Sequence, residues 1–353
     1  MKRITAFLLV AGLIPIAEVA AFPVPNIEWS PEGYVCYRAA GEICIDGKVS
    51  ESDWSQAPWT DEFVDIEGDL KPLPRYRTRV KMLWDENYFY IAAEMEEPDL
   101  WATYRERDSV IYHENDFEVF IDPDGDNHEY YELEINALGT EWDLLLVKPY
   151  RDGGPAIHGW DIAGLKTAVA LQGTINDASD RDQGWTVEIA FPWTALAEAA
   201  HRSCPPEPGD RWRVNFSRVQ WKLNATDEGY AKRKDPSGKA LPENNWVWSP
   251  QGLIAMHYPE MWGFVEFAGS SGDFELTSID HTRWLLCRLY YAQRIYHEDY
   301  GSYTESFESL GIDLFNYEKP GPPSLTITPS GFEILVFDTQ GGAHHIDESG
   351  HIW

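Results

Sequence analysis

The stretch Glu114-Asn-Asp-Phe-Glu-Val-Phe-Ile-Asp-Pro-Asp-Gly-Asp-Asn127, with Tyr130-Tyr-Glu-Leu-Glu-Ile-Asn136 after it, contains the clearest structural signal in the chain. Apolar and acidic residues alternate in both halves, which is the period of a half-buried strand. The sequence Asp122-Pro-Asp-Gly125 between them is typical of a turn. The pattern therefore predicts two strands separated by an acidic turn.

Similar short runs occur on both sides of this stretch. Apolar and polar residues alternate in many of them, and no long helical pattern intervenes between about Pro31 and Phe267. Regularly spaced short strands of this kind indicate a mainly β protein with an antiparallel β-sandwich, which we assign to residues 31–267. One short helix is expected over 192–200, where Pro192 stands in the first turn. The other predicted strands cover residues 79–84, 88–94, 185–190, 212–216 and 262–267.

The composition changes after the predicted sandwich. Residues 268–273 read Ala-Gly-Ser-Ser-Gly-Asp, which is typical of a flexible linker. Beyond it, apolar residues at helical spacing predict a helix over 281–297 with Asp280 as its N-cap. Strands are expected over 324–328 and 331–337. We therefore predict a small α+β C-terminal domain over 274–353.

The charge and the aromatic content restrict the function. The 353 residues include 28 Lys+Arg against 59 Asp+Glu, for a formal net charge of -31. Nucleic acids and anionic membranes need a cationic surface, so both are excluded as partners. The chain also has 16 Trp, 18 Tyr and 15 Phe. This exceeds what a core needs, so some rings are expected at a binding surface.

The first 21 residues are predicted to be a signal peptide. Lys2 and Arg3 precede an apolar stretch, residues 5–16, that is too short to span a bilayer comfortably. Small residues before Phe22 suit cleavage, and no Cys follows that would carry a lipid anchor. We expect a periplasmic or extracellular protein with no membrane insertion after cleavage. In that compartment Cys36 and Cys44 could form a disulfide or remain free.

The middle of the chain resembles the family 9 carbohydrate-binding modules. The resemblance rests on the acidic strand stretch above, on Ile45-Asp-Gly47 with Trp54, on residues 80–91 and on Gly184-Trp-Thr-Val-Glu-Ile-Ala-Phe-Pro-Trp193. It is strongest to the family-9-like proteins of bacterial envelopes, which are related to DOMON domains. It implies a β-sandwich that binds sugars, with structural calcium ions.

The resemblance also implies a site in which a sugar lies between two aromatic rings. Tyr112 matches the first ring, and Glu118 and Asn136 match two polar contacts. The family's arginine is replaced here by Glu134, and Arg218 on a neighbouring strand could restore a cation. The second ring falls near Met256 or His257. The nearby residues that could replace it, or belong to the core instead, are Trp246, Trp248 and Tyr258.

The acidic turn is the candidate metal site. Asp122, Asp124 and Asp126 alternate around a Gly, as at the start of a calcium loop, because hard cations prefer clustered carboxylates. Leu133 stands where an EF-hand has its bidentate Glu, and such turns also occur without metal. No haem or nucleotide is expected. The adjacent Met256 and His257 are residue types that can ligate haem iron, but on a strand they would face opposite sides and could not both bind one iron. No phosphate-binding loop that would hold a nucleotide occurs.

These observations predict a secreted or periplasmic, non-catalytic protein of polysaccharide catabolism that binds a polysaccharide or oligosaccharide. Two alternatives remain open. Glu118 and Glu134 could be the carboxyl pair of a glycoside hydrolase, or could form a structural salt bridge with Arg218. The chain could also be a structural envelope protein whose sandwich no longer binds sugar.

Overall fold

A computed structural model describes residues 22–268, 272–312 and 321–353. The predicted signal peptide, residues 1–21, and positions 269–271 of the predicted linker lie outside the described residues, so both remain predictions. Within the described ranges, no helix is both long enough and apolar enough to cross a membrane.

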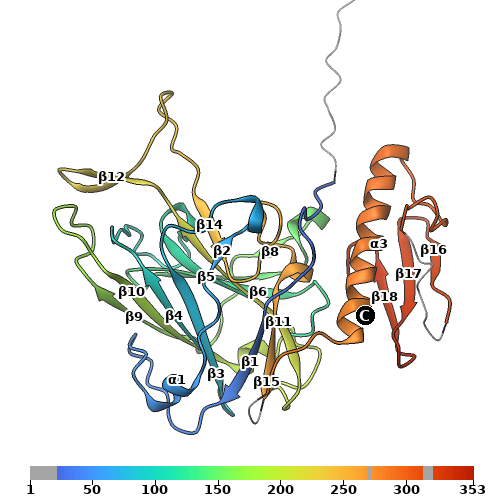
Figure 1. The fold of residues 1–353 in the computed structure, drawn as a ribbon, viewed down its shortest axis with the longest axis horizontal. Helices are drawn as coiled ribbons and strands as arrows, with labels where there is room; N and C mark the ends of the chain where they lie inside the picture. Colours follow the sequence, from blue (N-terminus) through green and yellow to red (C-terminus); the bar gives the residue numbers. More distant parts are fainter. Residues whose placement is uncertain (1–21, 269–271, 313–320) are drawn as a thin grey trace, which may run out of the picture.

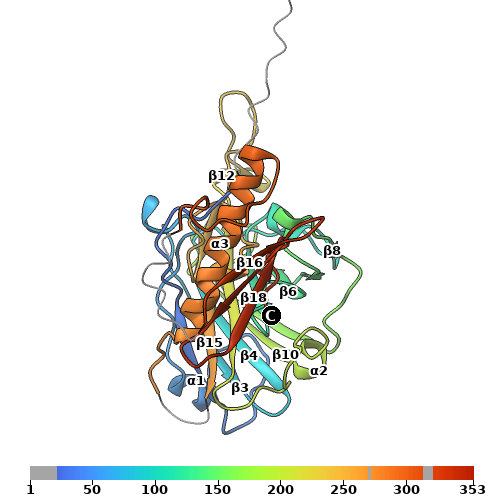
Figure 2. The same ribbon diagram turned by 90° about the vertical axis from the view of Figure 1, so that its right-hand side faces the viewer.

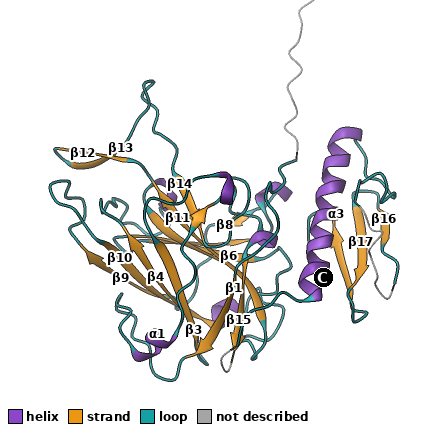
Figure 3. Cartoon of the chain, viewed as in Figure 1, coloured by secondary structure: helices purple, strands orange, loops and turns teal. Residues whose placement is uncertain are grey.

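The body of the molecule is a curled 13-stranded sheet whose two halves face each other across a hydrophobic core, as Figures 1 and 3 show. This confirms the predicted mainly β sandwich. The strand order is β8 (Ala156–Ile157), β7 (Glu141–Leu146), β6 (Tyr130–Asn136), β5 (Asp116–Asp122), β11 (Arg211–Gln220), β15 (Gly263–Ala268), β1 (Gly33–Arg38), β3 (Thr78–Trp84), β4 (Tyr88–Glu96), β10 (Gly184–Pro192) and β9 (Lys166–Gln172), and β14 (Asn244–Val247) with β2 (Val64–Asp65) branches from β11.

The sheet is not antiparallel throughout. Strand β1 pairs in parallel with both β15 and β3, while the other strand pairs that the structure describes are antiparallel. The strand prediction missed this because alternation reports which face is buried and carries no information on strand direction.

Alternation along β5 explains how the sheet forms both a core and a site. Phe117, Val119 and Ile121 point into the main core with β3, β4 and β10. Each such side chain contributes about 1.5–3 kcal/mol of hydrophobic free energy when it is fully buried. Glu118 and Phe120 then face the opposite side, because successive side chains of a strand alternate. The acidic residues are therefore placed together by the same pattern that builds the core.

Short elements decorate the sheet. The hairpin of β12 (Leu223–Thr226) and β13 (Gly229–Lys232) projects from the body in Figure 1. The predicted helix over 192–200 is found only as α2 (Trp193–Leu196). The other short helices are α1 (Ser52–Gln56) and the single 3₁₀ turns η1 (Gly68–Leu70), η2 (Ile111–His113), η3 (Tyr150–Asp152) and η4 (Pro259–Met261).

The C-terminal part combines α3 (Ser278–Tyr300) with a three-stranded antiparallel sheet of β16 (Ser324–Ile327), β17 (Phe332–Phe337) and β18 (Ala343–Asp347), seen in Figure 2. The predicted N-cap of α3 was wrong. Thr277 caps the helix and accepts a hydrogen bond from the backbone N–H of Asp280, whose carboxylate accepts one from the N–H of Thr277. Asp280 is thus the second half of a capping box.

The C-terminal part shares a core with the body. One hydrophobic cluster joins Leu286, Leu289 and Tyr290 of α3 to Tyr258 and Met261 of the sandwich. The four cysteines are all free. Cys36 is buried in the main core and Cys44 is exposed. The alternative of a disulfide between them therefore fails, because β1 directs the Cys36 side chain inward.

Candidate functional site

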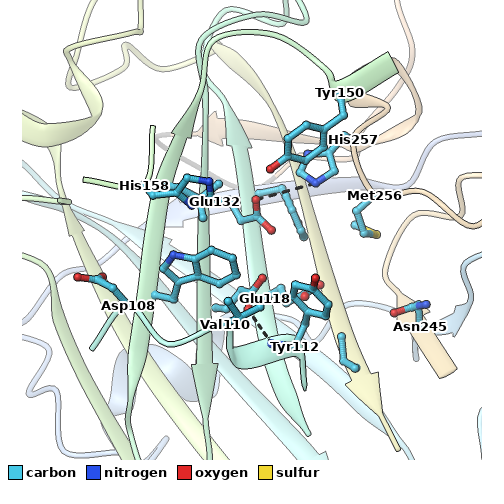
Figure 4. A pocket seen from close by; sticks show the side chains of 15 residues that line it. Asp108, Val110, Tyr112, Glu118, Glu132, Tyr150, His158, Asn245, Met256 and His257 are labelled. Atoms are coloured by element: carbon cyan, nitrogen blue, oxygen red, sulfur yellow. Dashed lines mark hydrogen bonds and ion pairs between the residues drawn. The ribbon is translucent and has the colours of Figure 1, made fainter. Parts of the chain in front are cut away.

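A cavity of about 640 Å³ opens on the face of β5, β6 and β7 that lies opposite the main core. Figure 4 shows 15 side chains that line it. Its acidic residues come from neighbouring strands: Glu118 of β5 lies directly across from Glu134 of β6, and Glu132 follows on the same face two residues earlier. The strand pairing therefore assembles three glutamates on one wall.

Aromatic rings complete the cavity. Tyr112 of η2 stacks with Trp142 of β7 at a centroid distance of 6.3 Å, and Trp142 stacks with His158 at 5.7 Å. Tyr112 and Tyr150 are 40% and 51% exposed, so both offer ring surface to a ligand. In Figure 4, Tyr150 and His257 lie at one end of the cavity and Tyr112 at the other, with glutamates between them.

The glutamates of the cavity lack cationic partners. Glu134 accepts a hydrogen bond of 2.8 Å from the backbone N–H of Tyr112. The carboxylate of Glu132 lies 4.0 Å from His257 Nε2 and forms no hydrogen bond with the described residues. Burial, reinforced by neighbouring carboxylates, raises the pKa of Glu132 and Glu134 well above the usual range, and burial raises the pKa of Glu118 to about 7.

His257 does not supply the missing charge. Its Nδ1 lies 2.9 Å from the hydroxyl of Tyr130, and its ring packs on Tyr150 at 4.5 Å. Burial and the Arg151 cation lower the pKa of His257, so the neutral imidazole is favoured. The described lining of the cavity includes no Lys or Arg.

Four of the nine residues predicted to contact sugar meet in this cavity: Tyr112, Glu118, Glu134 and His257. Met256, the alternative position for the second ring, also lines it. Residues that sequence reasoning missed are Glu132, Trp142, Tyr150 and His158. Glu132 could have been found, because it lies two residues from Glu134 on a strand and so shares its face. Tyr150 gave no such signal, because it lies on an isolated turn.

The placement of Arg218 and Asn136 corrects their predicted roles. Arg218 is 1% exposed, and its guanidinium binds Glu97 Oε2 at 3.0 Å and the Glu96 carbonyl at 2.8 Å. It neutralises Glu97 and cannot restore a cation to the cavity, nor does it pair with Glu118 or Glu134. Asn136 donates hydrogen bonds to Glu114 and to the Tyr104 carbonyl, which ties the end of β6 to a loop.

The three other predicted ring residues are structural. Trp246 and Trp248 do share one face, and that face lies in the main core, where they are 2% and 3% exposed. Tyr258 is buried in the second cluster, and its hydroxyl donates to the Pro23 carbonyl at 3.0 Å. Their assignment as ligand platforms is therefore corrected. Alternation could establish a shared face but could not say which face is open.

The acidic turn after β5 has three carboxylates that could hold a metal ion. One oxygen each of Asp122, Asp124 and Asp126 lies within 4.8 Å of the others. Asp122 also accepts hydrogen bonds from the N–H groups of Gly125 and Asn127, at 2.8 and 3.0 Å. Burial and repulsion within the turn raise the pKa of Asp124 to about 6. These oxygen donors suit calcium.

The same turn is a contact surface for the C-terminal part. Arg283 of α3 donates to the carbonyls of Asp124 and Gly125, both at 3.0 Å. The His351 Nε2 lies 3.1 Å from Asp126 Oδ2, and the N–H of Ile352 donates to the Asp126 carbonyl. The acidic turn thus has a structural role that the sequence did not reveal.

Two short turns connect the cavity to the C-terminal part. Turn η3 directs Tyr150 into the cavity and Arg151 away from it, where Arg151 binds Glu260 of η4 through two nitrogens at 2.9 and 3.1 Å. On α3, Tyr291 donates to Glu260, and Arg294 pairs with Asp152. We call Arg151, Asp152, Glu260, Tyr290, Tyr291 and Arg294 the arginine-bridged interface. It fixes the turn that carries Tyr150.

Known carbohydrate-binding and carbohydrate-degrading proteins are similar to parts of this chain. The family model described as "Carbohydrate family 9 binding domain-like" matches residues 45–240. Over 117 residues, or 33% of the chain, the sequence is 29% identical to exoglucanase XynX of Acetivibrio thermocellus and 28% identical to endo-1,4-beta-xylanase A of Thermoanaerobacterium saccharolyticum. The matched segment spans only 9% and 8% of those two proteins.

Two solved structures are similar to this chain at low sequence identity. A family 9 module from Caldicellulosiruptor kristjanssonii in complex with cellotriose is 16% identical, with a TM-score of 0.44, and the match covers 70% of this chain and 98% of that one. A putative carbohydrate-binding protein from Bacteroides uniformis is 17% identical, with a TM-score of 0.48, and the match covers 67% and 100%. Because the family model matches more than half of its residues, this chain belongs to the carbohydrate family 9 binding domain-like family.

Proposed function

We propose that the cavity binds a sugar of a polysaccharide or oligosaccharide, and that the chain is an exported, non-catalytic binding protein of polysaccharide catabolism. The carrying observation is that exposed faces of Tyr112 and Tyr150 stand beside buried glutamates in one cavity. A pyranose needs both, because its C–H face packs on rings and its hydroxyl edge needs polar partners. The basic and apolar residues at the N-terminus support export.

The position of the carboxyls favours binding over hydrolysis. Glu118 and Glu134 stand at paired positions of adjacent strands, on the same sheet face. They therefore approach a sugar from one side, whereas the two carboxyls of a glycosidase flank the scissile bond.

The test is a glycan array followed by titration calorimetry, with Tyr112→Ala as the site variant. Loss of the ring should weaken binding by at least about tenfold, the effect of losing a hot-spot aromatic residue. The backbone N–H that binds Glu134 remains, so the free energy of unfolding should change by less than about 0.5 kcal/mol. Tyr300→Ala, an exposed ring on α3, is the matched control.

Three results would contradict the proposal. Release of reducing sugar by the wild type would show a hydrolase. No binding to any glycan would favour a structural protein. Equal loss of binding and of stability in Tyr112→Ala would show that this ring belongs to the core.

We also propose that Asp122, Asp124 and Asp126 hold a calcium ion, as the clustered carboxylate oxygens and the raised pKa values of Asp122 and Asp124 support. The ion would stabilise the turn between β5 and β6 and its contact with Arg283. It would have no part in sugar chemistry, because these residues do not line the cavity.

A further inference from the structure

The cavity has a charge pattern that a neutral sugar does not require. Glu118 and Glu132 are 5% and 6% exposed, Glu134 is 2% exposed, and Asp108 lies at the same lining. A neutral pyranose needs hydrogen-bond partners, which amides, hydroxyls or one carboxylate can supply. Three buried glutamates without a cation are a large electrostatic cost for that purpose.

The surroundings of the Glu132 carboxylate also indicate that a charged partner is missing. It is more than nine-tenths buried and lines the cavity, as Figure 4 shows, yet it has no hydrogen bond among the described residues. Buried carboxylates are ordinarily paired or hydrogen-bonded. Glu97 with Arg218 and Glu260 with Arg151 are such pairs in this protein.

The rings of the cavity suit the same kind of ligand. Tyr112 and Tyr150 are exposed, and aromatic π-faces attract ammonium groups as well as the C–H face of a sugar. Asp116, Glu118 and Glu134 also have one oxygen each within 4.8 Å of the others, so a metal ion is the competing occupant of this wall. The cavity volume of about 640 Å³ is far larger than a bare ion would fill.

Building on the proposed function, we propose that the ligand of this cavity is an amino sugar, a pyranose whose free ammonium group pairs with Glu132 and its neighbours Glu118 and Glu134. The ammonium group offers three donors, so it can bridge carboxylates on β5 and β6. Burial raises the pKa of Glu118 and Glu132, and a bound ammonium group would lower it, because a nearby positive charge favours the ionised carboxylate.

The experiment compares three disaccharides that share a β-1,4 backbone and differ at C2: the free diamine of glucosamine, its N-acetylated form and cellobiose. Calorimetric titrations of the full chain at physiological ionic strength should show the diamine binding at least about tenfold more tightly than the other two. Glu132→Gln should reduce this preference by most of that factor. Glu86→Gln, an exposed residue paired with Arg38, makes the same change in net charge and should leave it unchanged.

The outcomes separate this inference from the proposed function. Equal binding of all three disaccharides would overturn the inference and leave sugar binding standing. If neither these disaccharides nor any other glycan binds, the proposed function is overturned. The amino-sugar assignment is wrong if spermine binds as tightly as the diamine. It is also wrong if Glu86→Gln lowers the preference for the diamine as much as Glu132→Gln does. In both cases the protein recognises positive charge alone.

Discussion

The cavity and the arginine-bridged interface both bury acidic side chains, and they treat them in opposite ways. At the interface, Glu260 is bound by Arg151 and Tyr291, and Asp152 by Arg151 and Arg294. In the cavity, Glu118, Glu132 and Glu134 meet no Lys or Arg among the residues that the structure describes. Turn η3 contributes to both regions through adjacent residues, Tyr150 and Arg151.

This contrast indicates which buried charges maintain the structure and which await a ligand. A buried carboxylate with an arginine partner has its desolvation largely offset within the chain, and removing the partner is costly. A buried carboxylate without one lowers the stability of the folded protein and persists where a ligand can offset it. Removing, adding or titrating a charge in each region therefore tests this distinction.

The largest effect is expected when the cation is removed from the interface. Arg151→Met leaves the buried side chains of Glu260 and Asp152 without their shared partner, so the free energy of unfolding should fall by about 3–5 kcal/mol. Urea denaturation measures it. Arg38→Met, in an exposed pair with Glu86, is the matched control and should cost less than about 1 kcal/mol. Equal losses in both variants would remove the distinction between the regions.

A cation added to the acidic turn should act next most strongly. If calcium binds Asp122, Asp124 and Asp126 only in the folded state, stability should rise by ~2.7 kcal/mol at a hundredfold excess over Kd. Magnesium should do less, because it requires tighter octahedral geometry. Melting curves in calcium, magnesium and sodium at matched ionic strength test this, with Asp124→Asn as the variant that should lose the response. The same rise in all three salts would mean general screening.

Removing one carboxylate from the cavity should change the free energy of unfolding in the opposite direction to removing one from the arginine-bridged interface. Glu132→Gln should raise the free energy of unfolding at neutral pH by about 1 kcal/mol, because an uncompensated carboxylate is lost. Glu260→Gln, the matched change at the interface, should lower it. A loss of stability in both variants would show that the cavity glutamates are compensated after all.

The cavity also predicts a pH dependence. The pKa of Glu118 is raised from 4.5 to about 7, so the folded state binds the proton more tightly than the unfolded state does. Stability should therefore fall as pH rises from about 4.5 to about 7, and the slope should be shallower in Glu132→Gln, because Glu132 is a second carboxyl with a raised pKa and the variant no longer titrates there.

The sequence predicted the fold well because strand alternation is local. The family resemblance placed Glu118 and Glu134 in one sugar site, and the pairing of β5 with β6 sets them directly across from each other. It could not predict that Arg218 pairs with Glu97, or that Trp246 lies inward, because those outcomes depend on which sheet covers which face. Long-range contacts such as His351 with Asp126 left no local pattern at all.

The smallest effect concerns a cation that is present only at low pH. The contact of His351 with Asp126 is intermediate between the paired carboxylates of the interface and the unpaired ones of the cavity. The His351 ring contacts Asp126, but its side chain is 37% exposed. The hydrogen bond to Asp126 raises the pKa of His351 above 6.5, while burial lowers the pKa of the stacked His128. The pairing should stabilise the protein fully below the unfolded pKa of about 6.5 and be lost as pH rises through the folded value. Solvent screening limits the gain to a few tenths of a kcal/mol. An NMR titration of the His351 imidazole is therefore the sensitive measurement. Its pKa should lie above the unfolded value in the wild type and fall in Asp126→Asn, whereas a value at or below 6.5 in both would show that this contact carries no charge.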